Sequence, residues 1–204
     1  MRIKFLFFLF FSSAIAAPAP YPAKPLDAAT LTEATVLVSD VADSTAPGKT
    51  YLAGTLIAAP VTKLCAIIGD FAAYPGFMPN TTSATIVRKA ETHTVVDMAL
   101  SLPLGQVKRT RLQMQPTAAA DGCKMSWIML PRANVPVEEA IADTVGSWHI
   151  SPHPTRPGYA VVQYFVYTDP GPVPFGLGWI VDTMGKESLP KTLEALRTRA
   201  LKIP

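Results

Sequence analysis

Charged residues and cysteines are scarce in this 204-residue chain, and common catalytic motifs are missing. Only 16% of the residues are charged, and eighteen basic against fifteen acidic side chains give a net charge of +3. That excess is too small to predict a nucleic-acid partner, which requires a dense basic patch. The sequence has no G-x-S-x-G elbow, no Walker loop and no G-x-G-x-x-G motif after a strand. It also lacks histidines at zinc-finger spacing from a cysteine pair. These absences favour a binding protein over an enzyme, with no cofactor and no metal.

The first residues have the three-part layout of a secretory signal peptide. Arg2 and Lys4 precede a wholly apolar run from Phe5 to Phe11, and small residues follow it. Ala14 and Ala16 form an A-x-A pattern, which predicts cleavage after residue 16. The apolar run is shorter than the roughly 20 residues that span a bilayer. We therefore expect residues 1–16 to be removed and the mature chain to be periplasmic or secreted.

The mature chain is predicted to begin with a proline-rich extended segment, residues 17–33, ahead of one folded domain, residues 34–204. Loss of Arg2 and Lys4 leaves sixteen basic and fifteen acidic side chains, a net charge of +1. Electrostatic attraction to anionic lipid needs far more charge than this. Contact with a membrane is therefore expected to be transient at most, and the sequence indicates no oligomeric state.

Export gives the two cysteines, Cys65 and Cys123, two alternative roles. In an oxidising compartment they can form a disulfide, which would stabilise the fold by about 4 kcal/mol in the loop-entropy description. Alternatively, both are small buried apolar side chains. Cys65 lies in an apolar helical pattern, which favours this second alternative.

Eight β-rich runs are separated by proline, glycine and aspartate, a pattern typical of antiparallel strands with short connections. The runs cover residues 35–41, 49–57, 82–89, 92–102, 105–115, 123–130, 146–151 and 159–167. Apolar residues alternate along several of them, as in Val96, Met98 and Leu100, so one face of the sheet is expected to be apolar. On the opposite face, Arg109 and Arg111 are expected to face the solvent, against Asp97. Without the register, the face that Trp127 occupies stays open.

Two segments have helical periodicity. A short helix follows Pro60, with Val61, Leu64, Cys65 and Ile68 on one side. A long helix is predicted for residues 175–202, where Pro190 interrupts the pattern and Ser188 can cap its second part. A twisted antiparallel sheet curls, and a long helix can pack into its concave face. We therefore expect an α+β fold with an apolar cavity between the sheet and this C-terminal helix.

Several short motifs resemble those of START-like (SRPBCC) domains. They comprise Ala59-Pro60-Val61, Ile68-Gly69-Asp70-Phe71, the Y-P-G-F-M-P run from Tyr74 to Pro79, Gly146-Ser147-Trp148, Tyr164, Asp169-Pro170-Gly171, and Ser188-Leu189-Pro190 followed by Leu193, Leu196 and Arg197. Together they resemble the polyketide-cyclase and coenzyme-Q-binding branch over about Thr50 to Lys202. The chain departs from that branch at Leu64-Cys65, where relatives often have an aromatic residue, and in its predicted export.

The resemblance implies a helix-grip fold, in which a curved antiparallel sheet wraps a C-terminal helix and leaves a hydrophobic pocket. It also implies an apolar ligand such as a lipid, quinone, sterol or polyketide-like molecule, held by a binding or carrier protein. The predicted ligand-binding residues are Phe77, Met98, Leu100, Leu112, Met114, Trp127, Trp148, Tyr164, Ile180 and Met184.

Two other functions stay open at this point. A cyclase, aromatase or hydrolase could use the same cavity, and its polar groups would come from Tyr164, Gln163 and His149. A non-enzymatic interaction module with a collapsed pocket is the third possibility. A pocket no larger than a water molecule would favour that module over a carrier.

Overall fold

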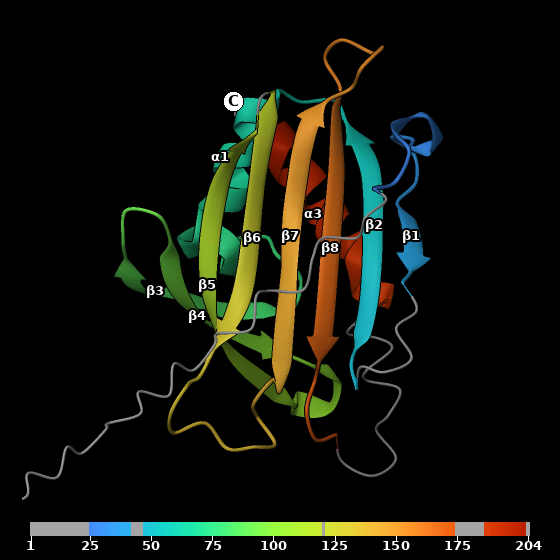
Figure 1. Ribbon diagram of the computed structural model, residues 1–204. Coiled ribbons are helices and arrows are strands. Elements are labelled where there is room, and N and C mark those ends of the chain that lie inside the picture. The colour runs from blue at the N-terminus through green and yellow to red at the C-terminus, as the bar shows by residue number, and fades with distance from the viewer. Residues whose placement is uncertain (1–24, 42–46, 120, 174–185, 203–204) are drawn as a thin grey trace, which may run out of the picture.

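A curved, eight-stranded antiparallel sheet forms most of the computed structural model, which describes residues 25–41, 47–119, 121–173 and 186–202 (Figure 1). The strand order is β1-β2-β8-β7-β6-β5-β4-β3. The strands are β1 (Leu37–Asp40), β2 (Lys49–Ile57), β3 (Thr81–Lys89), β4 (Thr94–Ser101), β5 (Val107–Ala119), β6 (Gly122–Leu130), β7 (Asp143–Pro152) and β8 (Ala160–Asp169). All eight predicted strands are confirmed, with ends that differ by a few residues.

In the described part of the chain, two α-helices cover the inner face of the sheet and lie behind it in Figure 1. Helix α1 (Val61–Gly69) follows Pro60 and buries Leu64, Ile67 and Ile68. Helix α3 (Ser188–Lys202) buries Leu189, Leu193, Leu196 and Ala200, whose spacing of three and four residues places them on one side of the helix. Short 3₁₀ helices are η1 (Ala28–Thr30), η2 (Phe71–Gly76) and η3 (Pro103–Gly105).

The predicted C-terminal helix is confirmed over the residues of α3. Pro190 lies in the first turn of α3, where its missing N–H requires no helical partner. The earlier part of the predicted helix, including Ile180 and Met184, lies outside the described residues. None of the described helices combines the length and the apolar character needed to cross a membrane.

Strand register shows which part of the inner face the helices cover. Cys123 on β6 pairs with Ile150 on β7, which pairs with Val162 on β8, and Val162 pairs with Thr55 on β2. Ile150, Val162 and Thr55 in this row are completely buried; α1 contacts β6 and β7, and α3 contacts β2. Trp127 lies four residues after Cys123 on β6 and pairs with Gly146 on β7. This second row of paired residues lies where the inner face borders the cavity described below.

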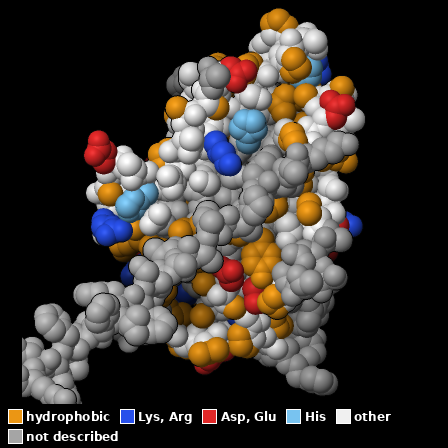
Figure 2. Space-filling model, in the orientation of Figure 1, with side chains coloured by type: hydrophobic (Ala, Val, Ile, Leu, Met, Phe, Trp, Pro, Cys, Tyr) orange, Lys and Arg blue, Asp and Glu red, His pale blue; other side chains and the backbone are white. Residues whose placement is uncertain are grey.

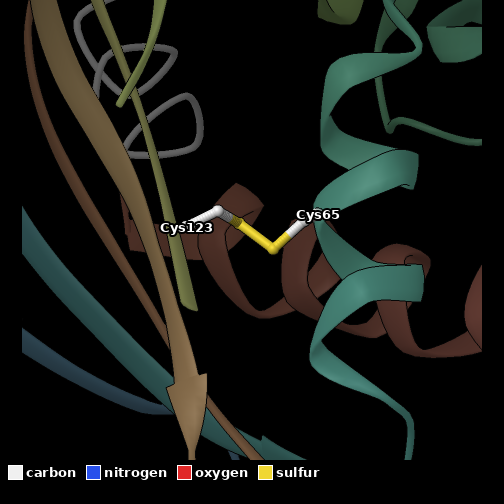
Figure 3. Close-up of a disulfide and its surroundings, with 2 residues drawn as sticks. All are labelled: Cys65 and Cys123. Atoms are coloured by element: carbon white, nitrogen blue, oxygen red, sulfur yellow. A yellow bond between two sulfur atoms is a disulfide. The ribbon is translucent and has the colours of Figure 1, made fainter. Parts of the chain in front are cut away.

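A disulfide joins the first row to helix α1. Cys65 on α1 and Cys123 on β6 are bonded, with a Cα–Cα distance of 6.1 Å and a sequence separation of 58 residues (Figure 3). The sequence preference for two unpaired apolar cysteines is therefore wrong. Both half-cystines are partly buried against the main core, so the apolar pattern around Cys65 is equally compatible with a bridge.

Residues 25–33 pack on the outer face of the sheet, although an extended segment was expected up to residue 33. The Gln163 side chain accepts a hydrogen bond from the Leu26 amide at 2.9 Å and donates one to the Leu26 carbonyl at 3.4 Å. Leu31 is 4% exposed and forms a second small core with Leu56 and Val161. The described part of the segment therefore belongs to the folded domain, because apolar side chains on the outer face need a cover.

The outer face carries charged and histidine side chains among apolar ones (Figure 2). Asp97 accepts two hydrogen bonds from Arg111, at 2.6 and 2.9 Å, and lies 3.3 Å from Arg132. The predicted contact with Asp97 is thus confirmed for Arg111, whereas Arg109 donates to the Glu139 carboxylate at 2.8 Å instead. The hydrogen bonds from Arg111, assisted by the charges of both arginines, lower the pKa of the Asp97 carboxyl, although partial burial opposes this effect.

Asp97→Asn is expected to lower the free energy of unfolding by about 1 kcal/mol at neutral pH. Because the pKa of Asp97 is depressed in the folded protein, its ionised form stabilises the fold above the ordinary carboxyl pKa of about 4. This stabilisation is lost as the pH falls through the folded-state pKa. Urea unfolding at decreasing pH should therefore show that the difference in free energy of unfolding between wild type and Asp97→Asn narrows towards zero. Asp143→Asn, at an exposed carboxylate, is the control, and a pH-independent effect of Asp97→Asn would contradict the assignment.

Candidate ligand-binding cavity

A cavity lies between the inner face of the sheet, η2 and the first turn of α3. The volume open to the centre of a water molecule is about 200 Å³, and the whole empty space, including solvent at the open side, is about 1250 Å³. A single water needs only about 10–15 Å³ by the first measure. The interior is therefore not collapsed, and it is large enough for a small organic molecule.

The walls of the cavity are mainly apolar. Strand β4 contributes Met98 and Leu100, and β5 contributes Leu112 and Met114. Met78 follows η2, and Leu189 lies on α3. Apolar surfaces facing an open volume favour an apolar occupant, because its transfer from water gains about 25 cal/mol per Å² buried.

Three aromatic side chains form a continuous wall, which we call the aromatic wall: Trp127, Trp148 and Tyr164. The ring centroid of Tyr164 lies 4.3 Å from that of Trp148 and 5.4 Å from that of Trp127. Trp127 pairs with Gly146 across the strands, and a Cβ built on Gly146 would lie 2.2 Å from the Trp127 ring. The absence of a side chain at Gly146 therefore allows the Trp127 indole to lie close against the sheet.

Most hydroxyl groups of the lining already have protein partners. Thr144 Oγ1 donates to the Tyr167 carbonyl at 2.8 Å and lies 3.2 Å from Thr168 Oγ1. Thr192 Oγ1 donates to the Ser188 carbonyl at 2.9 Å. Thr110 Oγ1 has no partner but is enclosed by protein atoms. Lys49 is the only charged lining residue in the part of the chain that the structure describes, and its side chain is exposed.

Tyr74 and Lys108 fix neighbouring parts of the wall. The Tyr74 hydroxyl donates to the Ile68 carbonyl at 2.6 Å, which holds η2 against α1, and burial raises the pKa of this phenol. The Lys108 ammonium donates to the carbonyls of Ala140 and Pro172, both at 3.1 Å. Burial lowers the pKa of Lys108. These bonds fasten two loops whose neighbouring residues, Ile141 and Pro170, line the cavity.

The structure brings most of the predicted ligand-binding residues together. Met98, Leu100, Leu112, Met114, Trp127, Trp148 and Tyr164 all line the cavity. The register also settles the face of Trp127, which points inwards. Ile180 and Met184 fall outside the described residues. Whether any of these side chains contacts a ligand stays a prediction.

Phe77 is placed elsewhere, so its assignment to this cavity is wrong. Its ring lies in a separate groove with Lys63 and Asp70, and the Arg199 guanidinium lies 5.5 Å from the ring centroid. Tyr74 and Met78 line the cavity in its place, because the chain turns through η2 between them.

Sequence reasoning missed several lining residues. Tyr51 on β2 was identifiable in principle, because the pattern of Tyr51, Ala53 and Thr55 places it on the inner face. Ile141 lies in the loop before β7, where side-chain direction has no period. Its position depends on a tertiary contact, because its amide donates a hydrogen bond to the Arg109 carbonyl at 3.2 Å.

The polar candidates for an enzyme do not converge. Of Tyr164, Gln163 and His149, only Tyr164 lines the cavity. Gln163 holds Leu26 on the outer face, and His149 alternates with the inward-facing Trp148. Among the described residues, no group of three or more histidine, cysteine, aspartate or glutamate side chains could hold a metal ion.

The structure resembles solved START domains. A STAR-related lipid transfer protein from Xanthomonas axonopodis gives a TM-score of 0.68 at 18% identity, covering 82% of this chain and 94% of that chain. Human StAR-related lipid transfer protein 5 gives 0.67 at 15% identity, covering 82% and 83%. The di-domain aromatase/cyclase BexL from the BE-7585A biosynthetic pathway gives 0.55 at 15% identity, covering 79% and 53%. No protein-family model matches the sequence, and neither does any curated protein.

These likenesses define the class of fold. The chain has the START-like helix-grip α+β fold, with a curved antiparallel sheet around its C-terminal helix, as the sequence motifs predicted. At these identities the fold alone is shared. The ligand has to be argued from the cavity of this chain.

Proposed function

We propose that this protein is an exported binding or carrier protein that holds an apolar small molecule in the cavity between the sheet and α3. The observation that carries the proposal is an open volume of about 200 Å³ with mainly apolar walls. Each buried methylene group contributes about 0.8 kcal/mol, so a ten-carbon ligand gains about 8 kcal/mol before ordering costs. Useful affinity therefore requires no charged anchor.

Two observations support the exported location. Residues 1–16 have the layout of a cleaved signal peptide, and Cys65 and Cys123 form a disulfide. Disulfides persist mainly in oxidising compartments such as the periplasm and the cell exterior. We therefore propose that the mature protein binds its ligand outside the cytoplasm.

Native mass spectrometry of protein purified from the cells that produce it tests both parts of the proposal. The expected species is a chain without residues 1–16 that carries a bound apolar molecule, which solvent extraction then releases. Leu100→Trp should abolish the bound mass, because Leu100 lines the cavity and is only partly buried, so that a larger side chain extends into the open volume.

Ser101→Trp is the matched control, because Ser101 is the exposed neighbour on the same strand. This variant should keep the bound molecule. A folded protein that retains residues 1–16 would contradict export. A wild type that carries no more apolar material than Leu100→Trp would contradict the carrier function.

A further inference from the structure

We propose that the ligand is an uncharged, ring-containing molecule with a hydrogen-bond-accepting oxygen, and that the Tyr164 hydroxyl donates a hydrogen bond to that oxygen. This inference rests on the proposed function and assigns the chemical class of the ligand. It follows from three properties of the aromatic wall: its unused donor, its distance from charge and the shape of its rings.

The Tyr164 hydroxyl is the unused donor. Tyr164 lines the cavity and contacts Trp127 and Trp148 through its ring, and its hydroxyl makes no hydrogen bond to any other described residue. A second tyrosine in the lining, Tyr74, already donates its hydroxyl hydrogen to the Ile68 carbonyl. The Tyr164 oxygen is not one of the enclosed, unpaired side-chain atoms of the described residues, so it is open to the cavity. A ligand that displaces water from this hydroxyl has to replace the lost hydrogen bond, because leaving the donor unpaired costs about 1–3 kcal/mol. A ligand oxygen in the cavity would supply that hydrogen bond.

The surroundings of Tyr164 exclude a charged partner. Burial raises the pKa of the Tyr164 phenol, so it remains a neutral donor at physiological pH. The exposed Lys49 pairs with Thr168, four residues along β8 from Tyr164, a separation of about 13 Å. A carboxylate beside Tyr164 would therefore be desolvated with a single hydrogen bond and no counter-charge from the described residues of the lining, which is costly. A carbonyl or ether oxygen bears no such penalty.

The rings of the aromatic wall favour a flat ligand. Trp127 and Trp148 are 6% and 3% exposed, so packing holds both indoles in place, whereas Tyr164 is only partly buried. Aromatic rings with centroids about 4.5–7 Å apart attract each other beyond the effect of burial alone. A ligand ring can extend the row that Trp127, Tyr164 and Trp148 begin, with its oxygen directed to the phenol.

Three probes of similar shape separate these properties: 2-acetylnaphthalene, 2-ethylnaphthalene and 2-naphthoate. The first carries a carbonyl, the second is a hydrocarbon, and the third is anionic. In equilibrium dialysis with the mature, oxidised protein, 2-acetylnaphthalene should bind about tenfold more tightly than 2-ethylnaphthalene, the value of one net hydrogen bond. The anion should bind at least about a hundredfold more weakly than 2-acetylnaphthalene.

Tyr164→Phe removes only the hydroxyl. It should weaken binding of 2-acetylnaphthalene about tenfold and leave binding of 2-ethylnaphthalene unchanged. Tyr159→Phe is the matched control, because the Tyr159 hydroxyl bonds to Glu33 outside the cavity. This control should alter neither affinity.

The outcomes distinguish this inference from the proposed function. Equal wild-type affinities for the ketone and the hydrocarbon, or equal losses in Tyr164→Phe, would overturn the role of the hydroxyl. Tight binding of 2-naphthoate would overturn the uncharged ligand. In each of these cases, loss of binding in Leu100→Trp would still support an apolar cavity site. If no probe binds, or if binding is insensitive to Leu100→Trp, the proposed function itself fails.

Discussion

Replacement of both half-cystines, Cys65→Ala with Cys123→Ala, is expected to lower the free energy of unfolding by about 4 kcal/mol. The bond joins residues 58 apart, and cross-linking a loop of this length removes that much conformational freedom from the unfolded chain. The loss is comparable to a large part of the stability of a typical domain, about 5–15 kcal/mol. Urea unfolding of the oxidised protein, the reduced protein and the double variant measures it.

Reduced wild type serves as the control for the substitution. It should unfold at nearly the same urea concentration as the double variant, because both lack only the cross-link. The oxidised, denatured protein should contain no titratable thiol. Two free thiols, or equal stability of the oxidised and reduced forms, would show that the bridge is not formed. Binding of 2-ethylnaphthalene should persist in the folded double variant, since the bond lies in the row covered by helices.

Gly146→Ala is expected to destabilise the protein by about 3 kcal/mol and to disturb the aromatic wall. A Cβ at this position would lie 2.2 Å from the Trp127 ring and 2.4 Å from the Phe165 carbonyl oxygen. The second contact is to backbone of the neighbouring strand, so rotation of Trp127 cannot relieve both. Chemical unfolding should give the loss of stability, and near-ultraviolet circular dichroism should report the displaced indole.

Gly69→Ala is the control for that substitution. A Cβ on Gly69 meets no atom within 4 Å, and alanine favours a helix by up to about 1 kcal/mol relative to glycine. Its stability should therefore equal or exceed that of wild type. If Gly146→Ala behaves in the same way, the close approach between Trp127 and the sheet is not as described.

Strands were predictable from this sequence because their signals are local. Alternation in runs such as Val96, Met98 and Leu100 indicates both a strand and its apolar face, and glycine, proline or aspartate ends each run. Strands β3 to β8 then pair in sequence order, whereas β2 pairs with β8 and not with β3. The same alternation also predicted most of the cavity wall, because the alternating apolar residues and the cavity lie on the same face of the sheet.

The remaining features depend on contacts between distant segments. The face of Trp127 depends on the register between β6 and β7, which its own run does not encode. Phe77 has an apolar side chain in a motif next to the cavity, but the turn of η2 directs it to a separate groove. The disulfide required knowledge that α1 crosses β6 at Cys123. The sequence patterns alone do not specify these contacts between distant segments.

The packing of residues 25–33 decides how the mature protein can be attached to a surface. Leu26 and Leu31 lie on the outer side of the sheet, whereas the described strand residues that line the cavity face the inner side. A linker joined ahead of residue 25 would leave from the back of the sheet, so the ligand side would face the solvent. Immobilisation by the N-terminus is therefore the orientation to choose for a sensor chip built on this protein, and a version beginning at residue 34 would uncover Leu56 and Val161 and invite self-association.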